Sequence, residues 1–184
     1  NPEPIAPFFD LFYMGEGETQ YRALLDLYKK WRAEGGSRED FLHEAAKIPG
    51  IYVPSLYDVT YKEDGTIDAM TPIYDDVPKT VRKEIVLDMT GAVYPEKPLL
   101  PHIRAVQDRV VLEIQRGCIR GCRFCQAGMV YRPVRERDVE RLKQLAVTML
   151  HNTGYDEISL SSLSSSDYSK LPELVNFLIE ECSK

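Results

Sequence analysis

The sequence has no long hydrophobic run, no excess of basic residues and no cysteines spread along its length. No apolar stretch approaches the roughly 18 residues that a membrane-spanning helix needs, so no such helix is predicted. The net charge of −6 argues against nonspecific nucleic-acid binding by the whole surface. A secreted disulfide framework spreads an even set of cysteines along the chain, whereas three of the four cysteines here are clustered and Cys182 stands apart. Clustered thiols in a chain of soluble, globular composition (43% apolar, 28% charged) indicate a reducing compartment, and we expect a cytoplasmic protein.

Three cysteines fall within eight residues, at Cys118, Cys122 and Cys125, with the spacing C-x3-C-x2-C. Three thiolates can hold three irons of a four-iron cluster and leave the fourth iron open, whereas a cluster used only for electron transfer usually takes four cysteines. A catalytic site needs an open metal position because substrate or cofactor can then bind the metal directly. Gly117 and Gly121 flank the first two cysteines and would let the backbone approach a bulky cluster closely.

A structural zinc site is the main alternative for these cysteines. Zinc takes four ligands, so one more side chain would have to join the three thiols. The spare candidates are Cys182, His151 and His102, all of which lie on other segments of the chain.

The first half of the sequence predicts an α+β region. Helical spacing over residues 20–33 ends at Gly35, and residues 37–40 form a capping box that opens a second, short helix. Apolar, β-branched and aromatic residues predict strands, with the Asp64-Gly65 pair as the tight turn of an antiparallel hairpin. The expected strands are residues 51–53, 57–61 and 82–88, with a terminal strand followed by a loop within residues 8–18.

The second half predicts a β-α-β-α series after a proline-rich linker. The expected elements are a strand at 109–115, a helix at 138–152, a strand at 157–160 and a helix from Leu171. Strands that alternate with helices indicate a parallel sheet or barrel, whose active site lies at the carboxyl ends of the strands. The cysteine loop (residues 117–126) comes after the first strand and the serine loop (residues 161–166) after the second. We therefore expect the two loops to lie side by side.

The cysteine spacing, with Phe124 just before the last cysteine, resembles the radical S-adenosylmethionine superfamily. The stretches 111–118, 121–128, 131–135 and 154–168 are similar to one subfamily, which couples a radical S-adenosylmethionine barrel to an upstream cobalamin-binding-like domain. The resemblance implies three regions, namely the tail of that upstream domain (1–18), an α+β connecting region with a helical segment and a small hairpin (19–100), and the N-terminal part of the barrel (101–184). The implied fold class is α/β, with the first two β-α units of a partial TIM-type barrel.

The resemblance also implies the cofactors and their ligands. Cys118, Cys122 and Cys125 would ligate a [4Fe-4S] cluster whose open iron chelates the amino and carboxylate groups of S-adenosylmethionine. One electron, from a donor such as flavodoxin or ferredoxin, would cleave the sulfonium and start radical chemistry on a substrate that the sequence does not identify. Phe124 would pack near the adenine.

The serine loop departs from the family pattern. Superfamily members often hold the methionine amino group with a Gly-Gly-Glu pattern after the second strand, and here Ser161, Ser162 and Ser164 occupy that place. Their hydroxyl and carbonyl groups could serve instead, and a flexible loop is the alternative. The upstream domain of the subfamily binds cobalamin through a histidine-containing loop. The sequence has no such loop, so we expect that this chain does not hold cobalamin, whatever a longer protein does.

Several charged residues near the cysteines have two interpretations. The arginines are Arg116, Arg120, Arg123, Arg132, Arg135, Arg137 and Arg141. We expect structural roles for Arg137 and Arg141, and for the others we leave open a solvated surface, anion binding or, for the first three, tuning of the cluster potential. Glu113 faces away from Leu112 and Ile114, so it points into a barrel interior or forms a buried ion pair with an arginine.

These features predict a fragment of a radical S-adenosylmethionine enzyme, and the alternative is a nonenzymatic iron–sulfur or zinc module for electron transfer or assembly. The chain begins without Met and ends inside a helical pattern, and it carries only two β-α units. We therefore expect no turnover from this chain alone, no catalytic residue beyond the cluster ligands, and self-association through unpaired strand edges.

Overall fold

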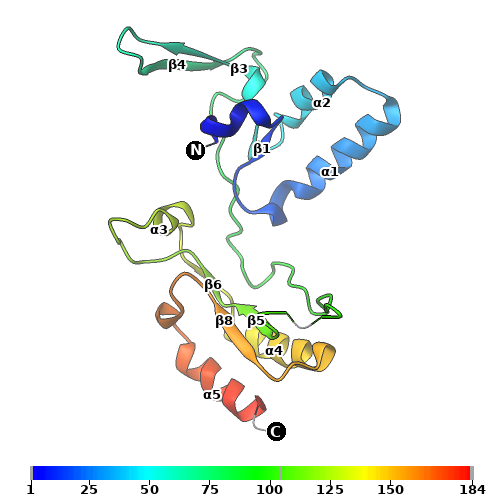
Figure 1. The fold of residues 1–184 in the computed structure, drawn as a ribbon, viewed down its shortest axis with the longest axis vertical. Helices are drawn as coiled ribbons and strands as arrows, with labels where there is room; N and C mark the ends of the chain where they lie inside the picture. Colours follow the sequence, from blue (N-terminus) through cyan, green and yellow to red (C-terminus); the bar gives the residue numbers. More distant parts are fainter. Residues whose placement is uncertain (1, 104, 183–184) are drawn as a thin grey trace. The chain divides into compact units, whose positions relative to one another are not determined.

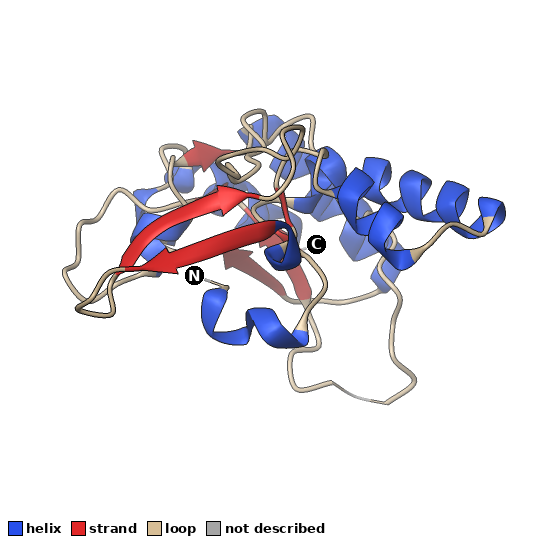
Figure 2. Cartoon of the chain, turned by 90° about the horizontal axis from the view of Figure 1, so that it is seen from above, coloured by secondary structure: helices blue, strands red, loops and turns tan. Residues whose placement is uncertain are grey.

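The structure is a computed structural model that describes residues 2–103 and 105–182, except for the side chain of Cys182 (Figure 1). Its contacts divide the chain into two compact units, Asn1–Val86 and Leu87–Lys184. Figure 2, coloured by secondary structure, shows helices and short strands joined by long loops, so the chain is of mixed α/β structure. None of the described helices combines the length and the apolar character needed to cross a membrane.

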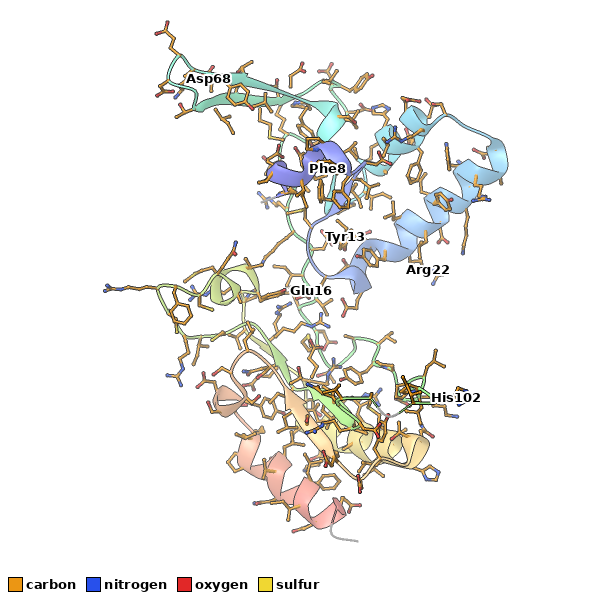
Figure 3. The ribbon with its side chains drawn as sticks, in the orientation of Figure 1. Phe8, Tyr13, Glu16, Arg22, Asp68 and His102 are labelled. Atoms are coloured by element: carbon orange, nitrogen blue, oxygen red, sulfur yellow. The ribbon has the colours of Figure 1, made fainter. Side chains whose placement is uncertain are left out.

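The first unit contains two α-helices, each with a capping residue at one end. Helix α1 (Gly17–Glu34) ends at Gly35, which adopts the left-handed conformation that glycine allows, and its N–H reaches the Trp31 carbonyl. Helix α2 (Arg38–Ala45) opens with the predicted capping box, in which the Ser37 hydroxyl accepts from the Asp40 N–H and the Asp40 carboxylate accepts from the Ser37 N–H. The side chain of Arg22 extends from α1 into solvent (Figure 3).

The strands of the first unit form two small antiparallel pairs. Strand β1 (Phe12–Tyr13) pairs with β2 (Ile51–Tyr52), and β3 (Tyr57–Tyr61) pairs with β4 (Ile67–Pro72) in the hairpin that the Asp-Gly turn predicted. Two short 3-10 helices, η1 (Glu3–Phe8) and η2 (Pro54–Leu56), complete the unit. The terminal strand predicted within residues 8–18 is therefore only two residues long, and Phe8 belongs to η1 instead.

The strand predicted at residues 82–88 is wrong. The segment makes a single bridge, between Gly15 and Glu84. The Glu84 N–H donates to the Met14 carbonyl, and the Glu84 carbonyl accepts from the Glu16 N–H. Two residues further along, the Val86 N–H turns to the side chain of Glu16 instead of a backbone carbonyl, so the ladder does not continue.

The second unit contains the predicted strand, helix, strand and helix in that order, with four further short elements between them. Its elements are β5 (Val110–Glu113), β6 (Gln115–Arg116), α3 (Ala127–Val130), β7 (Arg135–Glu136), α4 (Val139–Thr153), β8 (Ile158–Ser161), η3 (Ser165–Asp167) and α5 (Leu171–Cys182). Strands β5 and β8 are parallel, with Val110 opposite Ile158 and Glu113 opposite Ser161. The partial barrel stays a prediction.

The predicted strand at 109–115 is divided in two at Ile114. The Ile114 N–H still donates to the Ser161 carbonyl at the end of β8, but the Ile114 carbonyl accepts from the Arg137 N–H. The chain thus changes partner from β8 to β7, which pairs antiparallel with β6. This change leads the chain out of the sheet and into the cysteine loop.

Apolar side chains from β5, α4 and α5 form the core of the second unit. Along β5, Val110 and Leu112 are buried whereas Val111 is 37% exposed, so one face of the strand is covered. Leu142, Leu145 and Leu174 pack in the same cluster, and Figure 1 shows α4 and α5 beside β5 and β8. The cysteine loop and the serine loop therefore follow strands that are anchored in this hydrophobic core.

Candidate functional site

The cysteine loop and the serine loop lie side by side, as the strand order predicted. Parallel strands end at the same edge of their sheet, and two contacts link the segments at that edge. Gln115 Nε2 donates to the Ser164 carbonyl at 2.7 Å. Arg120 Nε donates to Asp167 Oδ2 at 2.9 Å, directly after the serine loop.

The three clustered thiols are free, and two of them accept hydrogen bonds from the backbone. The Arg120 N–H donates to Cys118 Sγ and the Gly128 N–H donates to Cys125 Sγ, each at 3.4 Å. Cys118 and Cys125 are half-buried, whereas Cys122 is exposed. N–H groups directed at sulfur stabilise a thiolate that binds iron, so this donor set fits an iron–sulfur cluster.

The thiols do not converge in the described conformation. Across residues 2–103 and 105–182, no group of three or more His, Cys, Asp or Glu side chains is placed to hold a metal ion. A single hydrogen bond joins two backbone groups within the loop, from the Cys125 N–H to the Cys122 carbonyl at 3.1 Å, so little opposes a rearrangement around a cluster.

Gly117 is the glycine that the loop requires. Its φ is +82°, and a Cβ there would lie 2.6 Å from the Pro133 carbonyl oxygen and 2.8 Å from that of Tyr131. Arg135 binds the same two oxygens, from Nε to Pro133 at 2.9 Å and from Nη2 to Tyr131 at 3.2 Å. Arg135 thus holds residues 131–133, the returning chain, against Gly117. A Cβ at Gly121 would meet nothing within 4 Å, so the surrounding chain requires glycine at position 117 but not at position 121.

The electrostatics of the site centre on Arg120 and Asp167. The Asp167 side chain is only 10% exposed, and hydrogen bonds from Arg120 and Ser164 lower the pKa of its carboxyl. The pKa of Arg120 is raised, first by the hydrogen bond to Asp167 and further by the negative charges of Cys118 and Cys122. The guanidinium therefore lies within the field of two of the proposed ligands.

The serine hydroxyls hold the serine loop together. Ser164 Oγ donates to Asp167 at 2.7 Å, Ser162 Oγ lies 2.9 Å from Ser165 Oγ, and the Ser164 N–H donates to Ser162 Oγ at 3.1 Å. These bonds are typical of a shaped turn rather than of a flexible loop. The hydroxyl proton of Ser164 is used, but its oxygen retains acceptor lone pairs. Ser161 ends β8 and is exposed.

Phe124 is 92% exposed. Among apolar residues near the cysteines, Ile119 in the same loop and Tyr131 after α3 are also exposed. The structure thus leaves the face of the Phe124 ring accessible to a ligand.

Glu113 forms an ion pair with an arginine, which was one of its two predicted roles. Arg116 binds it in a two-pronged geometry, with Nε–Oε1 at 2.9 Å and Nη2–Oε2 at 3.0 Å. Arg137 lies 3.7 Å from the same carboxylate and is almost fully buried, and its Nη1 donates to the Met89 carbonyl at 2.5 Å. Burial lowers the pKa of Arg137 while Glu113 opposes that shift.

The structural roles expected of Arg137 and Arg141 are confirmed. Arg141 forms an ion pair with Glu96 at 2.8 Å, and its N–H donates to Asp138, the N-cap of α4. Arg132 donates to the Gly128 carbonyl at 3.0 Å, so its side chain is bound to the preceding helix α3.

The residues suggested for a zinc site lie apart from this loop in the sequence. His151 and His102 are exposed, at the end of α4 and in the segment before β5, and neither joins the cysteines in a metal-binding group among the described residues. Cys182 ends α5 and its side chain lies outside the described residues. A hollow of about 940 Å³ in the first unit, lined in part by Asp10, Arg38 and His43, contains none of the predicted site residues.

Two residues of the site were not singled out from the sequence. Gln115 follows Val111 and Glu113 in the strand alternation, so nothing in the sequence marks it as a buried donor. Asp167 lies three residues after Ser164, a spacing typical of side chains that cap a turn, but nothing in the sequence pairs it with Arg120.

Comparisons with known proteins locate two family regions. The sequence model described as "Radical SAM proteins, N-terminal" matches residues 1–54, and the one described as "Radical SAM superfamily" matches residues 112–182. An uncharacterized protein of Methanocaldococcus jannaschii is 30% identical over 175 residues, an alignment that covers 95% of this chain and 32% of that protein. The chain thus spans about a third of the length of this relative. The matches do not confirm the cobalamin-binding subfamily. Radical S-adenosylmethionine superfamily domains are therefore found in this chain, an N-terminal domain over residues 1–54 and the superfamily domain over residues 112–182.

Proposed function

We propose that this chain is part of a radical S-adenosylmethionine enzyme and that Cys118, Cys122 and Cys125 ligate a [4Fe-4S] cluster. The observation that carries the proposal is the position of the C-x3-C-x2-C loop beside the serine loop, at the carboxyl ends of parallel strands and within the superfamily match. When bound, the cluster and S-adenosylmethionine would supply one-electron cleavage of a sulfonium and hence a radical that abstracts hydrogen.

The chain's own residues would bind and orient these groups. The N–H groups of Arg120 and Gly128 would stabilise thiolates on iron, as they contact Cys118 and Cys125 here. Ser164 Oγ has its proton bound to Asp167, so its free lone pairs suit an ammonium donor such as the methionine amino group. Ser161 and Ser162 would line the same loop, and the exposed Phe124 ring would contact the adenine.

The remaining functions belong to a longer protein. We propose that the two β-α units open a partial TIM-type barrel and that the division into residues 1–18, 19–100 and 101–184 describes its regions. An electron donor such as flavodoxin or ferredoxin would reduce the cluster in a reducing, cytoplasmic setting. The chain itself would bind no cobalamin, would show no turnover alone, and would self-associate through the open edges of β5 and β8.

Anaerobic reconstitution with iron and sulfide tests the proposal. The wild-type chain should bind close to four irons, as expected for one cluster. Cys118→Ala, Cys122→Ala and Cys125→Ala should each lose most of that iron, while Cys182→Ser should retain it. Adding S-adenosylmethionine should change the electron-spin spectrum of the reduced cluster, because the cofactor would bind the open iron.

Two other outcomes of these measurements would contradict the proposal. Unchanged iron loading in the three alanine variants would refute the assignment of the ligands. A cluster that forms but does not respond to S-adenosylmethionine, together with iron loss in Cys182→Ser, would instead indicate an electron-transfer module with four cysteine ligands.

A further inference from the structure

Arg120 and Asp167 form a two-pronged ion pair between the two loops. Nε of the guanidinium donates to Oδ2 at 2.9 Å, and Nη2 contacts Oδ1. Parallel N–H···O bonds of this kind fix the orientation of both partners as well as their separation. A single lysine-like point charge would not impose that geometry.

Asp167 is held in place from its own side. Its side chain is 10% exposed and accepts a hydrogen bond from Ser164 Oγ at 2.7 Å, and Asp167 ends η3, directly after the serine loop. The Asp167 N–H also donates to the Ser164 carbonyl at 3.0 Å, the same carbonyl that Gln115 binds. The position of the Asp167 carboxylate at the end of the serine loop is therefore fixed by hydrogen bonding and burial.

Arg120 belongs to the cysteine loop, which has fewer hydrogen bonds than the serine loop. It lies between Cys118 and Cys122 in the cysteine loop, and its backbone N–H donates to Cys118 Sγ at 3.4 Å. One residue therefore contacts a proposed ligand through its backbone and the fixed carboxylate through its side chain. Ordering a loop that has few backbone hydrogen bonds costs conformational entropy, and a contact made before the cluster binds reduces that cost.

We propose that Arg120 and Asp167 act as a clasp, positioning residues that hold Cys118 and Cys122 near the serine loop and so favour cluster retention. The inference rests on the proposed function, in which these thiols bind iron. Because the Arg120 side chain is 61% exposed, the pair should add little to global stability, and variants of it should fold.

The test compares Arg120→Gln, Asp167→Asn and the double variant with a matched control, Arg123→Gln, at an exposed arginine of the same loop. The first readout is the rate at which reconstituted protein loses iron to a chelator. Each single variant should lose iron roughly threefold faster or more, and the double variant should be no worse than the singles, because both remove one interaction. Arg123→Gln should behave as wild type.

The second readout does not require the cluster. In the iron-free protein, alkylation of Cys118 by iodoacetamide, followed by peptide mass spectrometry, should be roughly threefold faster in Asp167→Asn than in wild type. Arg120→Lys keeps the charge but loses the two-pronged geometry, so it should resemble Arg120→Gln rather than wild type.

The clasp would be overturned by single variants that match wild type in both readouts, or by effects in the double variant that are fully additive. Full rescue by Arg120→Lys would also overturn it, since charge alone would then explain the effect. A wild-type chain that binds no iron would refute the proposed function, while the alkylation comparison would still decide whether the clasp exists.

Discussion

The side-chain amide of Gln115 donates a hydrogen bond to the Ser164 carbonyl oxygen at 2.7 Å, and this bond joins strand β6 to the serine loop. Gln115 is 2% exposed, and its Oε1 has no hydrogen-bond partner among the described residues. The orientation of the amide is fixed, because only Nε2 can donate to a carbonyl. Besides the hydrogen bonds within the serine loop, one buried donor from β6 thus anchors that loop.

Replacing that donor should destabilise the second unit. Gln115→Glu places a carboxylate oxygen against the Ser164 carbonyl, so a buried hydrogen bond becomes a repulsion. We expect a loss of about 1–3 kcal/mol in the free energy of unfolding, measured by urea denaturation. Gln144→Glu makes the same change at an exposed position of α4 and should stay within about 0.5 kcal/mol of wild type. Equal stability of Gln115→Glu and wild type would show that the bond is not formed.

A second prediction separates the two glycines that flank Cys118 and Cys122. Gly117→Ala forces an L side chain into φ +82° and drives Cβ to 2.6 Å from the Pro133 carbonyl oxygen. The backbone strain alone should cost about 1–2 kcal/mol, and the returning chain must also move. Gly121→Ala meets nothing within 4 Å, so it should be tolerated.

Iron content after reconstitution and urea denaturation both measure this difference. Gly117→Ala should bind less iron than wild type and unfold at lower urea, whereas Gly121→Ala should match wild type in both. Similar losses in the two variants would mean that the returning chain does not lie against Gly117.

The sequence predicted the elements of the second unit well because their signals are local. Helix α4 runs from Val139 to Thr153, between its N-cap Asp138 and its C-cap Gly154, and both ends lie within a residue of the prediction, since capping residues act on the turn next to them. The position of the two loops could be predicted from strand order, because parallel strands that alternate with helices present their carboxyl ends together.

The parts that the sequence did not predict depend on tertiary partners. Residues 82–88 have strand-like composition, but a strand needs a neighbour along its length, and here the ladder stops after Glu84. The Arg120–Asp167 pair joins residues 47 positions apart, and no spacing rule connects them. The change of partner at Ile114 likewise depends on β7, a two-residue strand too short to recognise by pattern.

A third prediction concerns the core that supports the site. Leu145 on α4 is fully buried in the cluster with Leu112 and Ile114. Leu145→Ala removes buried apolar atoms and leaves a cavity, so it should cost about 2–5 kcal/mol of unfolding free energy. Val147, on the same helix, is 43% exposed, and Val147→Ala should change stability by less than about 0.5 kcal/mol. Thermal unfolding followed by circular dichroism should show a large shift for the first variant only, and equal shifts would contradict this packing.

The last prediction is a pH dependence that arises from Tyr168. Its hydroxyl donates to the Arg137 carbonyl at 2.9 Å, the residue is 3% exposed, and burial, with Glu136 and other acids nearby, raises the pKa of Tyr168 from 10.0 to about 12. Below pH 10 the phenol is protonated in both the folded and the unfolded chain, so its contribution to stability is complete. Between pH 10 and 12 the unfolded chain loses this proton first, which stabilises the unfolded state, and the contribution is lost as the pH rises through the folded-state pKa.

Tyr168→Phe isolates this contribution, because phenylalanine does not titrate. Below pH 10 the variant should be less stable than wild type by about 1 kcal/mol, since the Arg137 carbonyl loses its donor. From pH 10 to 12 wild type should lose at most about 3 kcal/mol more than the variant, the free-energy equivalent of a shift of two pKa units. Urea denaturation across this range measures both effects, and the stability difference between the two proteins should shrink or change sign. Parallel curves for wild type and Tyr168→Phe from pH 10 to 12 would show that the folded chain does not hold this phenol neutral.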